Sequence, residues 1–178
     1  MQIPELNIRQ NPYWIYIKYI LIGLLLSFLQ ITFVPLIEIA ESLPNLVFLY
    51  AVWLTLRYGR FIGFISAFLL GLIYDAFSLQ LIGVSSLSFL FGVFFASFWY
   101  KKDKEFLVLN SYKFILIMFA SCLIANLIQN LFYLRMSELE FLRLFILKWL
   151  GSTVYTSVLS SIIVFVIYQR NVKCIFPA

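Results

Sequence analysis

The chain contains no histidine and only two cysteines among its 178 residues. The absence of histidine removes the commonest metal ligand and the commonest general base. Cys122 lies inside an apolar run and Cys174 lies far from it in the C-terminal tail, so we expect no disulfide. The motifs HExxH, GxSxG, the P-loop and the paired-carboxylate pattern are missing as well. The sequence therefore predicts a protein that is not an enzyme and that uses no metal and no cofactor.

Charge is also scarce, because only 12% of the residues are charged whereas 63% are hydrophobic, with a mean hydropathy of +0.99. A soluble domain is roughly half apolar and about a quarter charged. This composition leaves too little polar surface for a water-soluble globule and predicts an all-α integral membrane protein. The length allows about six spans of about 20 residues each. We therefore expect a single polytopic membrane domain over residues 1–178.

Six apolar runs predict the membrane helices, at residues 13–34, 43–57, 60–78, 81–100, 112–133 and 144–169. The first run is too long for the apolar part of a cleavable signal, so we expect it to remain as a span. The second run gives only about 22 Å of helix, so it is either a short span or a re-entrant segment. A re-entrant pair would bury Arg57 and Arg60, which favours the short span.

The basic residues predict the orientation of these spans. Ten of the 13 lysines and arginines belong to one set of span ends and loops, namely Arg9, Lys18, Arg57, Arg60, Lys101, Lys102, Lys104, Lys113, Arg170 and Lys173. The alternate regions carry only Arg135, Arg143 and Lys148. By the positive-inside rule, both termini are expected in the cytoplasm. Because the cations sit at the ends of apolar runs, we expect no nucleic-acid partner.

Small residues recur at every fourth position of the third run, which places them on one inclined ridge of a helix. This ridge consists of Gly59, Gly63, Ala67 and Gly71 and ends at Asp75. The fourth run carries a second small-residue ridge, formed by Ser88, Gly92 and Ala96. Such ridges let helices approach closely, so both are predicted to be interfaces for helix packing or for a partner, and they suit packing against each other.

Polar residues gather in the outer half of the predicted membrane region. They are Asp75, Gln30, Asn126, Gln129, Asn130, Lys148 and Ser152. Either they line an outward-facing polar cavity, or they make hydrogen bonds between helices. Asp75 either faces a partner or a cavity, or simply reaches the outer headgroups, and Lys148 is a plausible internal partner for it.

The order of the residues around the first ridge resembles the pattern of the family of the rod shape-determining protein MreD. The resemblance rests on a proline, an apolar run ending in Arg-x-Gly, and then spaced small residues, an aspartate and a glycine. In this sequence the positions are Pro44, Arg57, Gly59, Gly63, Phe68, Gly71, Asp75 and Gly83. Asn45 stands where many relatives have aspartate, and Ile82-Gly83 stands where Pro-Leu-Gly is common.

The resemblance implies a multi-pass protein of the bacterial inner membrane that belongs to the Rod complex. Its expected neighbours are MreC, the MreB filament, RodA and a class B penicillin-binding transpeptidase. The implied function is a non-enzymatic scaffold that binds MreC and supports peptidoglycan synthesis during lateral wall elongation. The basic 101–113 loop is expected to meet either MreB or anionic membrane lipid.

The same family is similar to the S-components of ECF transporters, which have six helices and an outward pocket. The fold implied is therefore an S-component-like bundle. The alternative function that follows is a small-molecule-binding subunit of a membrane transporter.

Overall fold

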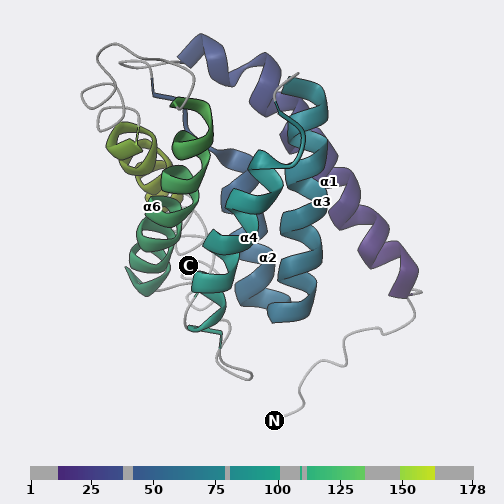
Figure 1. Ribbon diagram of the computed structural model, residues 1–178. Coiled ribbons are helices and arrows are strands. Elements are labelled where there is room, and N and C mark those ends of the chain that lie inside the picture. Colours follow the sequence, from purple (N-terminus) through teal and green to yellow (C-terminus); the bar gives the residue numbers. More distant parts are fainter. Residues whose placement is uncertain are drawn as a thin grey trace, which may run out of the picture.

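The computed structural model describes residues 12–37, 42–78, 81–100, 109, 112–134 and 149–162. The regular elements in these ranges are helices (Figure 1). They are α1 (Pro12–Thr32), the short 3-10 helix η1 (Val34–Ile37), α2 (Leu46–Tyr58), α3 (Arg60–Ser78), α4 (Val84–Ser97) and α6 (Tyr112–Leu134). Residues 149–162 are helical as well. The helices lie close to the apolar runs from which they were predicted.

The short helix α2 occupies the centre of the bundle. It contacts α1, α3, α4 and α6, and most of its 13 residues are buried. The neighbours α3 and α4 pack against each other, and α4 packs against α6. In Figure 1, α1 lies diagonally beside the bundle, and its N-terminal end extends away from the other helices. A helix as short as α2 is therefore surrounded by protein along most of its length.

Two glycines set the ends of the central helices. Gly59 follows α2 with φ +99°, and its N–H donates to the Thr55 carbonyl at 3.0 Å. Gly83 precedes α4 with φ +100°. Both values lie in the left-handed region that only glycine adopts at little cost. The chain can therefore reverse after α2 within a single residue and can enter α4 by a tight turn.

The core lies where α2, α4 and α6 meet. Its largest fully buried apolar side chains include Phe48, Phe89, Phe114 and Met118. The outward faces of the helices instead expose large apolar side chains such as Ile20, Phe68 and Phe91. An apolar core with an apolar exterior is the distribution expected of a protein that lies in lipid.

Two of the described helices, Arg60–Ser78 and Tyr112–Phe132, are long and apolar enough to cross a membrane. Shorter apolar helices cover Ile17–Thr32, Leu46–Tyr58 and Val84–Ser97. The predicted cytoplasmic termini and the basic residues Lys101, Lys102 and Lys104 lie outside the described residues. The prediction of six spans in an S-component-like bundle accordingly stays a prediction.

Candidate functional site

Asp75 lies near the end of α3 with its side chain completely buried. Its Oδ2 accepts hydrogen bonds from the backbone N–H groups of Gly83 at 2.8 Å and of Ser85 at 3.1 Å. Both N–H groups belong to the entry of α4. The N-terminus of a helix has unpaired donors and a partial positive charge, so a carboxylate stabilises it. Asp75 is therefore a cap that α3 provides for α4, and its side chain does not reach the outer headgroups.

The second carboxylate oxygen of Asp75 has no hydrogen-bond partner among the described residues. Close by, the side chain of Gln129 on α6 donates to the Ser85 hydroxyl at 3.5 Å. The acid thus lies in a small polar region where α3, α4 and α6 converge. The predicted partner Lys148 lies outside the described residues.

Arg60, at the opposite end of α3, contacts the C-terminus of α4. Its Nε donates to the carbonyl of Ser97, the last residue of α4, at 3.1 Å. A cation is favourable at a helix C-terminus for the reason that an anion is favourable at the N-terminus. The two charged residues at the ends of α3 therefore complement both ends of its antiparallel neighbour α4. Sequence reasoning predicted only a topogenic role for Arg60.

The first small-residue ridge is buried inside the chain's own bundle. A Cβ added at Gly71 would lie 2.6 Å from the backbone nitrogen of Ser86, so α3 and α4 are in backbone contact there. A Cβ at Gly63 would lie 2.7 Å from Cγ2 of Thr55 on α2. The ridge therefore serves two neighbours, α2 at its start and α4 near its end. Gly59 and Ala67 are buried as well.

The second ridge, Ser88, Gly92 and Ala96, is also fully buried. A Cβ at Gly92 would lie 2.7 Å from the ring of Phe48 on α2 and 3.0 Å from the Ser121 carbonyl on α6. Gly92 consequently faces α2 and α6. At this position the second ridge does not pack on the first ridge, contrary to the expectation from the sequence. Both ridges are covered by the chain's own helices, so a partner has to contact other surfaces.

Gln30 holds the non-helical chain that leads into α2. Its Nε2 donates to the Pro44 carbonyl at 2.6 Å, and its Oε1 accepts from the Leu46 N–H at 2.8 Å. Asn45 itself caps α2, because its side chain accepts from the Phe48 N–H at 2.9 Å. Backbone groups in an apolar layer must find partners within the protein. Gln30 therefore replaces hydrogen bonds that the unwound segment cannot make to itself.

The helix at 149–162 completes this arrangement. Ser152 donates to the Leu43 carbonyl at 2.8 Å, and the Thr156 hydroxyl accepts from the Asn45 N–H at 3.1 Å. Asn126 on α6 donates to the Thr153 hydroxyl at 3.1 Å. The predicted polar cluster included neither Thr156 nor Asn45, although a proline followed by an N-capping residue type was a signal for the helix start.

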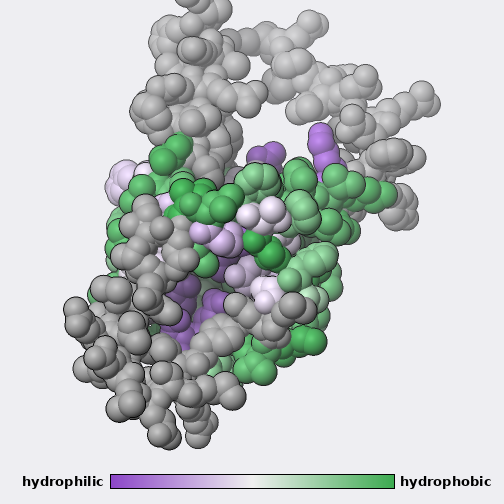
Figure 2. Space-filling model, turned by 90° about the horizontal axis from the view of Figure 1, so that it is seen from above, coloured by the Kyte–Doolittle hydropathy of each residue, from purple (hydrophilic) through white to green (hydrophobic). Residues whose placement is uncertain are grey.

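The predicted outer polar cluster thus divides into two hydrogen-bonded groups, both used between helices. Gln30, Asn126 and Ser152 belong to the group at the α2 entry, and Asp75 and Gln129 belong to the group at the α4 entry. Asn130 lies on the same helix as Gln129 and is half-buried. Figure 2, which looks onto the end where α3 gives way to α4, shows hydrophilic residues in a hollow with hydrophobic residues along part of its edge.

Three tyrosines on α1 and α2 form a further cluster that the sequence analysis did not find. The hydroxyls of Tyr19 and Tyr58 are hydrogen-bonded to each other, and the Tyr50 hydroxyl donates to the Tyr19 carbonyl at 3.1 Å. The Tyr58 hydroxyl also accepts from Nε of Arg57 at 3.2 Å. No motif spacing links residues on two different helices, so only the fold brings them together.

The comparison with protein families decides the identity. A model described as rod shape-determining protein MreD matches residues 8–170. The chain belongs to the MreD family. No curated protein and no solved structure matches it. Membership of MreD makes it a cell-shape-determining membrane protein from a family of structural proteins. Three of the positions that carried the resemblance, Gly63, Gly71 and Asp75, lie where α3 contacts α2 and α4.

Proposed function

We propose that this member of the MreD family is a non-enzymatic scaffold subunit of the Rod complex in the bacterial inner membrane. It binds MreC and supports peptidoglycan synthesis during lateral wall elongation, next to RodA, a class B penicillin-binding transpeptidase and MreB. The family match over residues 8–170 carries the proposal. The proposed partners come from the family. The proposed non-enzymatic role is supported by the way the side chains of the bundle pack.

The interior of the bundle supports a structural role. Asp75 is the one acidic side chain in the described ranges, and one of its oxygens is occupied by the α4 entry. The same ranges contain no group of three or more metal-ligating side chains. General acid–base chemistry needs a positioned group with access to a substrate. A buried acid that caps a helix is poorly placed for that purpose.

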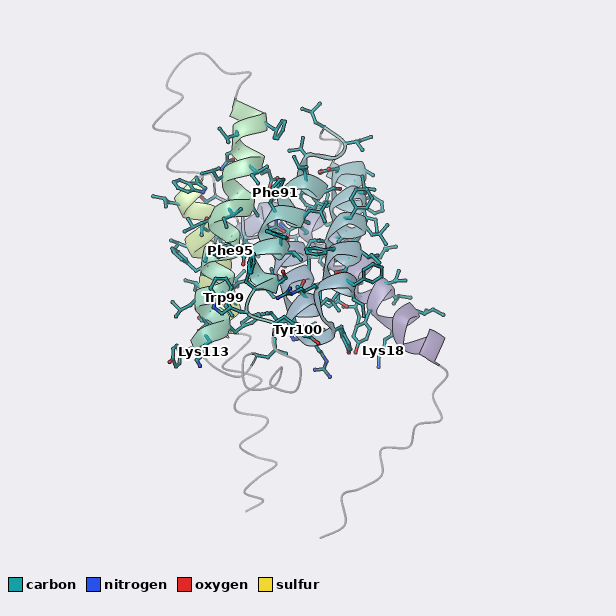
Figure 3. All side chains as sticks on the ribbon, turned by 60° about the horizontal axis from the view of Figure 1, so that its bottom comes forward. Lys18, Phe91, Phe95, Trp99, Tyr100 and Lys113 are labelled. Atoms are coloured by element: carbon teal, nitrogen blue, oxygen red, sulfur yellow. The ribbon has the colours of Figure 1, made fainter. Side chains whose placement is uncertain are left out.

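The outward faces support a role in binding other membrane helices. Because both small-residue ridges are buried against the chain's own helices, a partner helix must dock on apolar side chains that point outward. On α4 these include Phe91, Phe94 and Phe98, each of them half exposed. Phe94 stacks on Phe64 of α3 and packs against Phe98, so this surface is held rigid by ring contacts. Figure 3 shows Phe91 and Phe95 on α4, with Trp99 following just after the end of the helix.

Co-purification tests the proposal. The tagged full chain is expressed in its native host, extracted in a mild detergent and analysed for the proteins that accompany it. Stoichiometric recovery of MreC, with or without the synthase pair, is the expected result. A Phe91→Ala/Phe94→Ala variant should lower that recovery, whereas the control Phe119→Ala on α6 should not. Recovery of an ABC ATPase pair with a coupling membrane subunit in place of MreC would overturn the scaffold proposal.

The alternative, a small-molecule-binding subunit of S-component type, is favoured by one observation. The buried, unpartnered Oδ1 of Asp75 lies at the end of the bundle where Figure 2 shows the hydrophilic hollow. Against it, Gln30 and Ser152 are already engaged with backbone carbonyls. Thermal-shift measurements with vitamins and with lipid-linked wall precursors separate the two functions. The scaffold proposal predicts flat responses to the vitamins.

A further inference from the structure

A groove opens on the side of the bundle between α1, α2 and α3, at a distance from the polar groups at the α2 and α4 entries. Its volume is about 520 Å³, which is within the roughly 300–1,000 Å³ range of small-molecule sites. Its lining is almost wholly apolar and comes from Ile20, Leu54, Ile62, Ile65, Leu69 and Leu70, with Tyr19, Tyr50, Tyr58, Ser66 and Ile73 completing it. Its lining residues belong to α1, α2 and α3, and Figure 1 shows how α1 diverges from α3.

The groove has a closed floor and an open rim. Leu54 and Leu70 are buried, at 4% and 6% exposed, and form the floor. Ile20, Ile65 and Leu69 are about half exposed or more and form the rim. Because the rim belongs to the outward faces of α1 and α3, the groove opens on the side of the bundle and not at one of its ends.

The length of the groove matches a single membrane leaflet. Along α3 its lining extends from Ile62 to Ile73, which is about 16 Å of helix. Half of a hydrocarbon core of about 30 Å is about 15 Å. An acyl chain that enters at one end of the groove would therefore end near the middle of the bilayer.

The end of the groove at Tyr58 is basic and polar. Arg57 stacks on the Trp53 ring at 5.2 Å and on the Tyr58 ring at 5.6 Å, and its side chain is exposed. Lys18, next to Tyr19, is exposed as well. No acidic side chain pairs with either cation within the described part of the chain. Figure 3 shows Lys18, Tyr100 and Lys113 at this same end of the molecule.

We propose that this groove binds an anionic phospholipid, with one acyl chain along α3 and the phosphate between Arg57 and Lys18. Arg57 uses its Nε–H on the Tyr58 hydroxyl, and the terminal N–H groups of its guanidinium remain as donors for a phosphate. Tyrosine hydroxyls suit the level of the headgroups. A transmembrane helix fits the groove less well, because helix docking relies on small residues for close approach. Ser66 is the one small residue of the lining, and Gly63 and Gly71 face α2 and α4.

Native mass spectrometry of the purified full chain tests the proposal with two probes, phosphatidylglycerol and phosphatidylcholine. We expect phosphatidylglycerol to be retained and phosphatidylcholine to be lost on activation. Arg57→Gln should weaken retention about fivefold, the effect of one interfacial cation. The matched control is Arg60→Gln, because Arg60 donates to the Ser97 carbonyl of α4, whereas Arg57 lies on the ring of the lining residue Tyr58.

A second pair of variants tests the groove itself. Leu69→Trp fills the rim, whereas Phe68→Trp enlarges the neighbouring residue of α3, which is equally exposed but does not line the groove. Only Leu69→Trp should abolish retention, and Ile20→Trp should do the same from α1. Melting temperatures of all the variants show whether the fold is intact. Equal retention of both lipids, unaffected by Leu69→Trp and Ile20→Trp in folded protein, would mean ordinary boundary lipid and would overturn the proposal.

A photo-crosslinking residue at Ile65 in native membranes distinguishes the occupants. Adducts with phospholipid support the proposal, and an adduct with a protein helix, including a second copy of this chain, contradicts it. This inference does not depend on the scaffold function. Lipid retention is measured without MreC, so its failure is distinguishable from a failure to recover MreC.

Discussion

Removal of the Asp75 carboxylate would leave the N–H groups of Gly83 and Ser85 without acceptors inside the bundle. Each unpaired buried group costs about 1–3 kcal/mol, so Asp75→Ala should destabilise the protein by roughly 2–4 kcal/mol. Asp75→Asn keeps one acceptor oxygen and should cost only about 1 kcal/mol. Scanning fluorimetry of the purified proteins in detergent ranks the melting temperatures of the wild type and the two variants. Equal melting temperatures for Asp75→Ala and the wild type would show that the cap does not stabilise the bundle.

The glycines of α3 should differ from one another in their tolerance of a methyl group. Gly71→Ala presses on the backbone of Ser86, which cannot move without shifting α4, and should cost about 1–3 kcal/mol. Gly63→Ala meets only the side chain of Thr55, so it should cost less. Thr55→Ala should partly rescue Gly63→Ala and should leave Gly71→Ala unchanged. Thermal unfolding of the four variants checks this, and a rescue of Gly71→Ala would contradict the assigned contacts.

The sequence predicted at the residue scale that Gly63, Gly71 and Asp75 lie on one ridge, and it left open what they contact. It did not predict that Asp75 caps the N-terminus of α4. The position of Asp75 near the C-terminus of its own helix, where the helix dipole disfavours an acid, gave no sign of this role. The hydrogen bonds to Gly83 and Ser85 depend on how the chain turns after α3. That turn is a property of the fold and is not visible in the spacing of residues along one helix.

At the scale of elements, the two contacts that α3 makes with the ends of α4 should stabilise the protein unequally. Arg60 is exposed and water can replace its bond to Ser97, so Arg60→Gln should lower stability by only ~0.5 kcal/mol. High salt should reduce that difference further because exposed charges are screened. Unfolding measured at low and high ionic strength tests the expectation. A loss as large as that of Asp75→Ala would mean that Arg60 does more than complement the α4 terminus.

The helix bounds show which signals the sequence carries. The bounds of α3, Arg60–Ser78, are those predicted from the apolar run. The apolar run at 43–57 overestimated the start of α2, because Asn45 caps the helix and residues 43–45 are not helical. The run at 81–100 similarly included Gly83, whose positive φ lies outside α4. Hydropathy alone does not distinguish a helical apolar residue from a non-helical one.

At the scale of the molecule, the predicted topology places the α3–α4 turn outside and the basic loops inside. Single cysteines at Ile82 and at Tyr112, both exposed, should react oppositely in a background without Cys122 and Cys174. A membrane-impermeant maleimide should label the Ile82 position on intact spheroplasts and the Tyr112 position only after lysis. Labelling of both positions from outside would contradict the predicted orientation.

The all-helical architecture followed from composition, since so apolar a chain must satisfy its backbone internally. The groove between α1, α2 and α3 could not be predicted, because it depends on the angle at which α1 leaves the bundle. The division of the polar residues into two groups depends in the same way on which helices are neighbours. Periodicity identifies the face of a helix, and only packing identifies what covers that face.

The most direct test compares MreC recovery with the amount of folded protein for two kinds of variant. One kind alters the internal positions, with Asp75→Asn and Gly71→Ala, and the other alters the α4 surface, with Phe91→Ala/Phe94→Ala. We expect the internal variants to lose MreC only in proportion to folded protein, and the surface variant to lose MreC while it stays folded. Fully folded Asp75→Asn that no longer recovers MreC would contradict the account, because the aspartate would then act on the partner directly.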